Sequence, residues 1–242
     1  GQGLVAGINA SLKVQGKEEL ILKRSDAYIG VMIDDLVTKG TLEPYRLLTS
    51  RAEYRLILRH DNADMRLTRT GREIGLVDDE RWNAFQDKVT SYQTEIARLN
   101  KEKLKPLADT QEKLGAMGFG PIKDALTGIE FLKRPEVKYA DVIRFVGESS
   151  EKLDRTVIEL IETEVTYEGY IKKAKEQVEK MHRLEAKRIP KNMNWDALDS
   201  IATEARQKFK KINPETLGQA SRISGVNPAD ISILMVYLEG KR

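Results

Sequence analysis

Residues 78–99 read DDERWNAFQDKVTSYQTEIARL, and this stretch carries the clearest structural signal of the chain. Its large apolar residues recur at alternating spacings of three and four, at Trp82, Phe85, Val89, Tyr92, Ile96 and Leu99. That spacing places them on one side of an α-helix, in a seam that packs against another helix. The acidic residues 78–80 stand at the positive end of the helix dipole. We therefore predict a long helix here. Its seam serves core packing or, less favoured, a dimer contact.

A second long helix is predicted over residues 153–187, because apolar side chains again follow one helical stripe. Acidic residues predominate in its first half and basic residues in its second, which matches the helix dipole. Shorter helices are expected over residues 4–12, 25–40, 62–74, 139–146 and 199–212, and after the start signals Asn213-Pro214 and Asn227-Pro228. The predicted fold class is mainly α, a multi-helix domain with long paired helices and little or no sheet.

Composition excludes several classes of site and location. The 242 residues contain no cysteine and two histidines, which leaves no disulfide, thiolate or His-rich metal site. The longest apolar run without a charge, residues 231–238, is much shorter than the roughly 20 residues of a membrane span. The chain opens without a secretory signal. We expect no bound metal, no membrane contact and no catalytic constellation of side chains.

The positive charge of the chain is concentrated in residues 44–72. The whole chain carries a net +3, whereas this segment alone carries +4, from seven arginines and three acidic residues. The arginines are Arg46, Arg51, Arg55, Arg59, Arg66, Arg69 and Arg72. Guanidinium groups bind phosphate in bidentate fashion and stack on bases, and Tyr45 and Tyr54 offer further surfaces for unpaired bases. Alternatively, the three acidic residues neutralise several arginines in structural ion pairs.

Two short segments allow more than one interpretation. Residues 50–59 fit either a helix that begins at Ser50 with Glu53 completing a capping box, or a strand over residues 55–59. Residues 221–233 resemble two helices joined at Gly225. The backbone after Asn227 then offers a phosphate site, a protein-docking surface or a buried helical corner.

Seven segments in fixed order resemble one known family. They are residues 2–10 (QGLVAGINA), 34–37 (DDLV), 43–46 (EPYR), 49–56 (TSRAEYRL), 61–68 (DNADMRLT), 167–171 (YEGYI) and 221–232 (SRISGVNPADIS). The chain is similar to the C-terminal portion of the MnmG (GidA) family of tRNA uridine 5-carboxymethylaminomethyl modification enzymes. The resemblance runs from end to end and is loosest over residues 103–150.

This resemblance implies a cytoplasmic flavoprotein that binds FAD and takes electrons from NADH. With its GTPase partner MnmE, such an enzyme adds a (carboxymethyl)aminomethyl group to carbon 5 of the wobble uridine of tRNA. The resemblance also implies a homodimer in the full-length protein. The FAD site lies mostly outside this chain, so the chain alone is expected to be inactive. Gln2, at the start of the last helix of the FAD domain, is the expected cofactor contact; otherwise it touches nothing here.

The same resemblance suggests three parts. Residues 1–24 are the remnant of the FAD-binding domain, residues 25–150 hold the arginine-rich segment and a first helical subdomain, and residues 151–242 form a C-terminal helical subdomain. The C-terminal helices are expected to dock the GTPase and help hold tRNA. The expected tRNA-binding residues are Arg46, Arg51, Arg55, Arg59, Arg66 and Arg69. The alternative function is a helical protein-interaction module whose arginines are structural and make no direct contact with nucleic acid.

Overall fold

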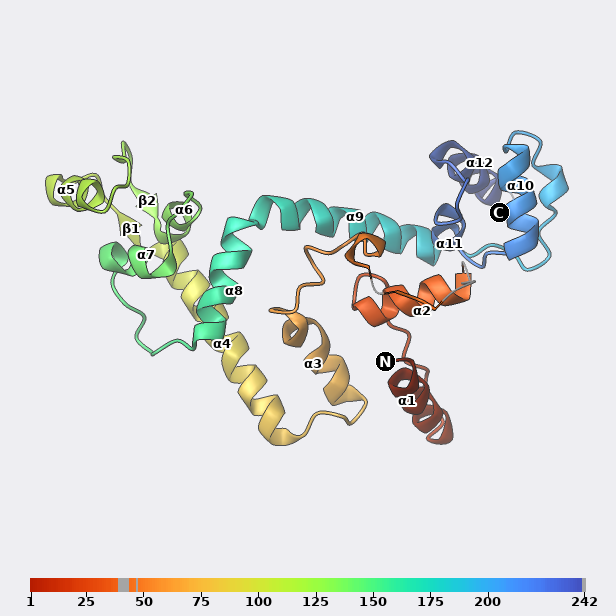
Figure 1. Ribbon diagram of the computed structural model, residues 1–242, viewed down its shortest axis with the longest axis horizontal. Helices are drawn as coiled ribbons and strands as arrows, with labels where there is room; N and C mark the ends of the chain where they lie inside the picture. The colour runs from red at the N-terminus through yellow and green to blue at the C-terminus, as the bar shows by residue number, and fades with distance from the viewer. Residues whose placement is uncertain (39–43, 47, 241–242) are drawn as a thin grey trace. The chain divides into compact units, whose positions relative to one another are not determined.

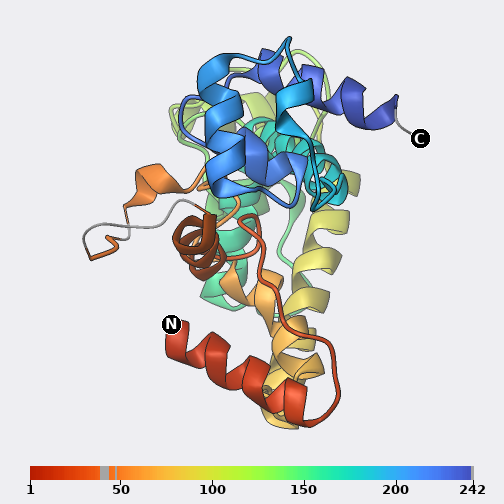
Figure 2. The ribbon, with the colours of Figure 1, turned by 90° about the vertical axis from the view of Figure 1, so that its right-hand side faces the viewer.

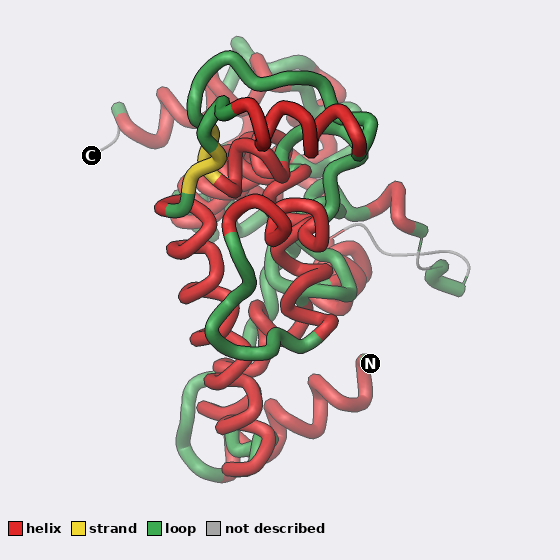
Figure 3. Tube along the Cα trace, turned by 90° about the vertical axis from the view of Figure 1, so that its left-hand side faces the viewer, coloured by secondary structure: helices red, strands yellow, loops and turns green. Residues whose placement is uncertain are grey.

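The computed structural model describes residues 1–38, 44–46 and 48–240 of the chain. Within those residues it forms α1 (Gln2–Val14), α2 (Tyr28–Thr38), η1 (Thr49–Arg51), α3 (Ala63–Glu73), α4 (Asp79–Lys101), β1 (Lys103–Leu104), α5 (Ala108–Ala116), β2 (Leu126–Thr127), α6 (Gly128–Leu132), α7 (Tyr139–Val146), α8 (Arg155–Thr166), α9 (Glu168–Ala186), η2 (Trp195–Ala197), α10 (Thr203–Ile212), α11 (Leu217–Ser221) and α12 (Pro228–Glu239) (Figure 1). The two strands form one small antiparallel sheet. Figure 3, which colours helices red and strands yellow, shows that the described chain is mainly helical. The predicted mainly α fold is confirmed.

The chain divides into two compact units. Unit 1 consists of residues 1–58 together with 172–242, and unit 2 consists of residues 59–171. The three-part division expected from the sequence, with boundaries after residues 24 and 150, stays a prediction. None of the described helices is long and apolar enough to cross a membrane.

Helix α4 organises the core of unit 2. Its amino end is capped by Asp78, whose side chain accepts a hydrogen bond from the backbone N–H of Arg81. The second half of its apolar seam packs into the main hydrophobic cluster of the unit, where Leu99 is fully buried and Tyr92 and Ile96 are partly buried. Helices α6 and α8 contact it there. For this half of the seam, the preferred prediction of core packing is confirmed.

A buried carboxylate is built into the same core. Glu95 of α4 is 1% exposed and accepts hydrogen bonds from the hydroxyl of Tyr139 at 2.8 Å and from Nη2 of Arg98 at 2.6 Å. Burial, followed by the hydrogen bond to Glu95, raises the pKa of Tyr139 to about 12. The tyrosine therefore stays protonated in the folded protein well above the pH at which a solvated phenol ionises.

We expect Tyr139→Phe to weaken the pH dependence of unit 2 stability in alkaline solution. An unfolded tyrosine ionises near pH ~10. Because the folded pKa is raised, the stabilisation is complete below pH ~10 and is lost as the pH approaches about 12. Over that window the unchanged protein should lose up to about 1.4 kcal/mol per pH unit more than the variant. Urea unfolding, followed by circular dichroism across that window, measures this difference. Parallel stability curves for the two proteins would contradict it.

The single helix predicted over residues 153–187 is wrong, because the structure forms two helices. Helix α8 ends at Thr166 and α9 begins at Glu168. Tyr167, between them, has backbone angles of −100° and 11°, outside the helical range, although its N–H still bonds to the carbonyl of Thr163. Gly169, the second residue of α9, weakens helix propagation at this point. The charge reversal noted in the sequence thus spans two helices.

The C-terminal residues of unit 1 form a helical bundle with its own core, seen as the blue helices in Figure 2. Asn227 caps α12 as predicted, in a capping box with Asp230, and Pro228 is its first residue. The predicted helix start at Asn213-Pro214 is wrong. Asn213 instead ends α10 in the left-handed conformation, at φ 49°, which asparagine tolerates better than most residues. Helix α11 begins after Thr216, whose side chain caps it.

The N-terminal residues of unit 1 form a smaller cluster. Val31 of α2 is buried with Ala52 and Leu58 from the arginine-rich segment. Both interpretations of residues 50–59 are wrong, since the chain makes a short 3₁₀ helix and turns there. The helix predicted over residues 25–40 is confirmed for Tyr28–Thr38, whereas its expected stop at Gly40 lies outside the described residues.

Candidate nucleic-acid interface

The arginine-rich segment is anchored in unit 1 by an arginine that precedes it. Arg24 is 6% exposed. Its Nη1 donates to Asp34 at 2.9 Å and to Asp35 at 2.8 Å, both on α2. Its Nη2 donates to Glu53 at 2.8 Å and to the backbone carbonyl of Arg51 at 3.1 Å. Burial by itself lowers the pKa of Arg24, but hydrogen bonds and charges of Glu53 and Asp35 outweigh it and raise the pKa. A charged Arg24 therefore fixes residues 51–53 against α2.

Two members of the arginine-rich segment, Tyr45 and Arg51, reach the buried carboxylate of Asp35. The hydroxyl of Tyr45 donates to Asp35 at 2.8 Å. The guanidinium carbon of Arg51 lies 4.6 Å from the centroid of the Tyr45 ring, a stacking arrangement, and its Nη1 is 3.9 Å from Asp35. Burial, followed by the hydrogen bond to Asp35, raises the pKa of Tyr45. The phenol therefore remains a neutral hydrogen-bond donor at physiological pH.

The second tyrosine of the segment is not available to a base. Tyr54 is 5% exposed and packs inside unit 1. Burial, followed by the charge of Glu53, raises its pKa. The expectation that Tyr54 offers an open stacking surface is therefore wrong, because its ring belongs to the core.

The buried network extends to the C-terminal bundle through Asp34. Nη2 of Arg222 donates to Asp34 at 2.9 Å, and its Nη1 pairs with Glu185. Glu185 also accepts a hydrogen bond from Thr216 at 2.7 Å. Sequence reasoning did not single out Arg24 or Arg222 for this role. The signal that indicates them is the Asp34-Asp35 pair within an otherwise apolar helix, because buried carboxylates need cationic partners.

Two arginines of the segment that belong to unit 2, Arg59 and Arg66, are hydrogen-bonded within that unit. Arg59 is held by Asp61 at 3.1 Å and Glu164 at 2.5 Å, and its side chain is only 13% exposed. Burial lowers the pKa of Arg59, but the hydrogen bonds and charges of Glu164 and Asp61 raise it overall. Arg66, half-buried, donates to Asn62 at 3.0 Å and to the carbonyl of Arg59 at 3.0 Å. For these two arginines, the structure shows contacts that stabilise the fold.

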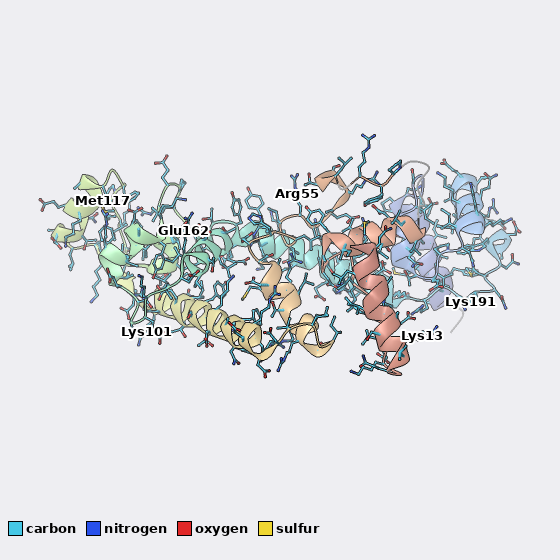
Figure 4. The ribbon with its side chains drawn as sticks, turned by 60° about the horizontal axis from the view of Figure 1, so that its bottom comes forward. Lys13, Arg55, Lys101, Met117, Glu162 and Lys191 are labelled. Atoms are coloured by element: carbon cyan, nitrogen blue, oxygen red, sulfur yellow. The ribbon has the colours of Figure 1, made fainter. Side chains whose placement is uncertain are left out.

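Three other candidate arginines are exposed. Arg46 and Arg55 belong to unit 1 and Arg69 to helix α3 of unit 2. Within the described residues, neither Arg55 nor Arg69 forms an ion pair. Figure 4 labels Arg55, whose side chain extends from the ribbon. A guanidinium held in solvent without a carboxylate partner retains its full capacity to bind an incoming phosphate.

The expected cofactor contact lies at the amino end of α1. Gln2 is the first residue of this helix and is exposed, and Gly1, at the cap position, supplies no side-chain hydrogen bond. A Cβ atom placed on Gly3 or Gly7 would have no neighbour within 4 Å, so the described chain provides no close backbone contact at either glycine.

In the described part of the chain, no group of three or more His, Cys, Asp or Glu side chains is arranged to hold a metal ion.

The turn before α12 is occupied by a carboxylate of the chain itself. Asp230 is buried, and its side chain accepts hydrogen bonds from the backbone N–H groups of Asn227 and Ala202, each at 3.0 Å. Pro228 has no N–H to offer. The acidic group leaves little attraction for a phosphate at this turn. Ile223 and Ile231 are buried while residues 227–229 are exposed, so the buried helical corner and the protein-docking surface both stay predictions.

Comparison with known families matches two consecutive segments of the chain. Residues 79–175 match the model described as the tRNA modifying enzyme MnmG/GidA C-terminal helical domain. Residues 177–242 match the MnmG/GidA C-terminal helical bundle. Together the two matches take in most of the chain after the arginine-rich segment.

Curated relatives and solved structures extend the match over the remaining residues. The tRNA uridine 5-carboxymethylaminomethyl modification enzyme MnmG of Lactococcus lactis strain IL1403 is 82% identical over 241 residues, which is 100% of this chain and 39% of the relative. The enzyme of the same name from Streptococcus thermophilus strain LMD-9 is 75% identical over 99% of this chain and 38% of the relative. The form II crystal structure of Aquifex aeolicus GidA has a TM-score of 0.77 and 38% identity, over 98% of this chain and 37% of that chain. The chain thus spans about two fifths of the length of these relatives. It belongs to the MnmG/GidA family, whose C-terminal helical region it matches.

Proposed function

We propose that this chain is the tRNA- and partner-binding part of an enzyme that modifies carbon 5 of the wobble uridine of tRNA. The observation that carries the proposal is the 82% identity, across the whole chain, to an enzyme named for that modification. Chemistry of this kind requires the protein to hold an anionic polymer in register with a reactive centre. The exposed arginines of residues 44–72 supply the charge for that task.

We assign the six candidate arginines to two roles. Arg46, Arg55 and Arg69 are exposed and are proposed to contact tRNA phosphates. Arg59 and Arg66 are proposed to support the surface rather than to bind RNA directly, since each is already hydrogen-bonded within unit 2. Arg51 lies between these classes, because its side chain is 35% exposed and stacked on Tyr45.

The cofactor and the partners are proposed for the full-length protein. Gln2 is the described residue suited to touch FAD, because an amide at an uncapped helix start sits where the dipole favours negative charge. FAD would supply redox chemistry, with electrons from NADH, and most of its site would lie in the part of the relatives that this chain does not cover. The GTPase MnmE, a homodimer and a cytoplasmic location are proposed with it. The isolated chain is proposed to be inactive.

We expect Arg55→Ala to weaken tRNA binding broadly and to lower the salt dependence of affinity. Each phosphate contact that is lost should reduce the slope of log affinity against log salt by about 0.7 to 0.9. Filter-binding measurements with the full-length protein, from low to physiological salt, give both affinity and slope. Arg69→Ala should have the same effect, since the Arg69 side chain is also exposed.

Arg81→Ala is the matched control, because Arg81 is an exposed arginine outside the arginine-rich segment. Its slope should equal that of the unchanged protein. If tRNA is not retained by the unchanged protein at any salt concentration, the chain is instead a helical interaction module without nucleic-acid contact. Equal slopes for all three variants would remove Arg55 and Arg69 from the interface.

A further inference from the structure

The Arg51–Tyr45 stack rests on a support that simple phosphate binding does not need. The hydroxyl of Tyr45 is tied to Asp35 at 2.8 Å, and Asp35 is 2% exposed. The backbone carbonyl of Arg51 is tied to Arg24 at 3.1 Å. Arg24 and Asp35 are themselves joined at 2.8 Å. One buried ion pair therefore fixes the phenol of one stacked residue and the backbone of the other.

The stacked guanidinium remains accessible. The Arg51 side chain is 35% exposed, and no second aromatic ring of the described chain covers it. Its face is planar and loosely hydrated, and such a face stacks on nucleobases, whereas phosphates bind the N–H groups at its edge. Arg55, four residues later, is exposed without any comparable support. This difference indicates that the orientation of the guanidinium plane matters for the role of Arg51. At Arg55, positive charge alone suffices for phosphate binding.

We propose that the Arg51–Tyr45 stack is a platform for one unpaired base of bound RNA, with Arg24 and Asp35 as its positioning residues. The platform rests on the proposed function, because the RNA in question is tRNA. Base stacking of this kind tolerates any base, since every base has a π face. The platform therefore adds affinity for an unstacked nucleotide without selecting its identity.

The first test replaces the planar guanidinium group of Arg51 with an ammonium group and so keeps the positive charge. In the full-length protein, Arg51→Lys should weaken tRNA binding about 10-fold with an unchanged salt slope, because a stacking contact is lost and no charge is lost. Arg81→Lys is the matched control and should leave tRNA binding unchanged, since Arg81 is an exposed arginine outside the arginine-rich segment. Thermal unfolding of both variants verifies that they are folded.

The second test replaces the ring beneath the arginine. Tyr45→Leu should weaken binding to a similar extent, whereas Tyr45→Phe keeps the ring, loses the tie to Asp35 and should cost about 2- to 3-fold. The binding partner is tRNA in which unpaired anticodon-loop bases are replaced, one at a time, by 2-aminopurine. One position should be quenched on binding to the unchanged protein, and the quenching should be lost with Arg51→Lys and Tyr45→Leu.

The base-stacking platform and the proposed tRNA-binding function are contradicted by different results. If Arg51→Lys and Tyr45→Leu bind normally while Arg55→Ala lowers the salt slope, the platform is wrong and the proposed function stands. If the unchanged protein does not bind tRNA, the proposed function fails and the platform fails with it. Quenching that persists in both variants would also overturn the platform, because the base would then stack elsewhere.

Discussion

Replacing Gly30 with alanine should destabilise unit 1 by about 3 kcal/mol, the upper end of what overpacking costs. Gly30 is the third residue of α2, and the backbone of residues 22–23 lies close against it. A Cβ atom on Gly30 would clash with the carbonyl oxygen of Lys23 and would lie 2.7 Å from that of Leu22. Both obstacles are backbone atoms, so no side-chain rotation relieves the clash. Relief requires the loop to move away from the helix, together with Arg24.

Amide hydrogen exchange provides the measurement, because it localises the effect. Gly30→Ala should accelerate exchange throughout α2 and lower the overall midpoint of thermal unfolding. The matched control is Gly7→Ala in α1, where the added Cβ would meet nothing within 4 Å. That variant should be neutral or stabilising by up to about 1 kcal/mol, because alanine is the better helix former. Equal behaviour of the two variants would refute the close approach at Gly30.

Elements governed by local signals were predictable from the sequence. The helices at 63–73 and 139–146 fall within or on their predicted ranges, and the Asn227 cap of α12 is in place. Each depends on interactions within a few residues: a periodic apolar face, a terminal glycine, or a capping side chain. Such signals are complete within a short window of sequence.

Elements decided by distant contacts were not predictable in the same way. Glu53 stands at the position where a capping box from Ser50 would use it, yet its carboxylate is bound by Arg24, 29 residues earlier in the chain. With Ala52 also drawn into the core, residues 50–59 become turns rather than a helix or a strand. No local pattern distinguishes these outcomes, because the choice depends on a charge contributed by another part of unit 1.

The candidate site was predictable from the sequence only in part, because composition reveals the arginines but not their partners. The concentration of arginine in residues 44–72 was evident from composition, and Arg55 and Arg69 are exposed as an interface requires. Composition did not separate them from Arg59, which faces two carboxylates. One of those carboxylates, Glu164, lies 105 residues away in the sequence. Sorting the arginines therefore required the fold.

Arg24→Met should lower the free energy of unfolding of unit 1 by about 3–5 kcal/mol, the cost of removing one partner from a buried ion pair. The carboxylates of Asp34, Asp35 and Glu53 would lose their shared cation. Arg24→Lys should also be costly, by about 2–3 kcal/mol, since hydrogen bonds to charged groups are among the strong ones. Arg24 uses Nε, Nη1 and Nη2 to reach its partners on both sides, whereas lysine has a single nitrogen.

The exposed pair of Arg188 and Glu215 provides the control within the same unit, with side chains 77% and 63% exposed. Arg188→Lys should change stability by less than about 0.5 kcal/mol, because solvent screens such pairs. Comparing the two Arg→Lys substitutions separates the effect of burial from the change of residue type. A large loss at both positions would mean that the substitution itself, rather than the buried network, is responsible.

The two tryptophans make it possible to observe how far the effect of Arg24 extends. Trp82 belongs to unit 2, and Trp195 is buried in the C-terminal bundle of unit 1. In a Trp82→Phe background, the emission of Trp195 reports the bundle alone during urea unfolding. Because Asp34 binds both Arg24 and Arg222, Arg24→Met should shift the Trp195 transition to lower urea. An unchanged Trp195 transition, with faster amide exchange in α2, would instead show that the bundle unfolds independently and that the shared carboxylate does not couple the two parts.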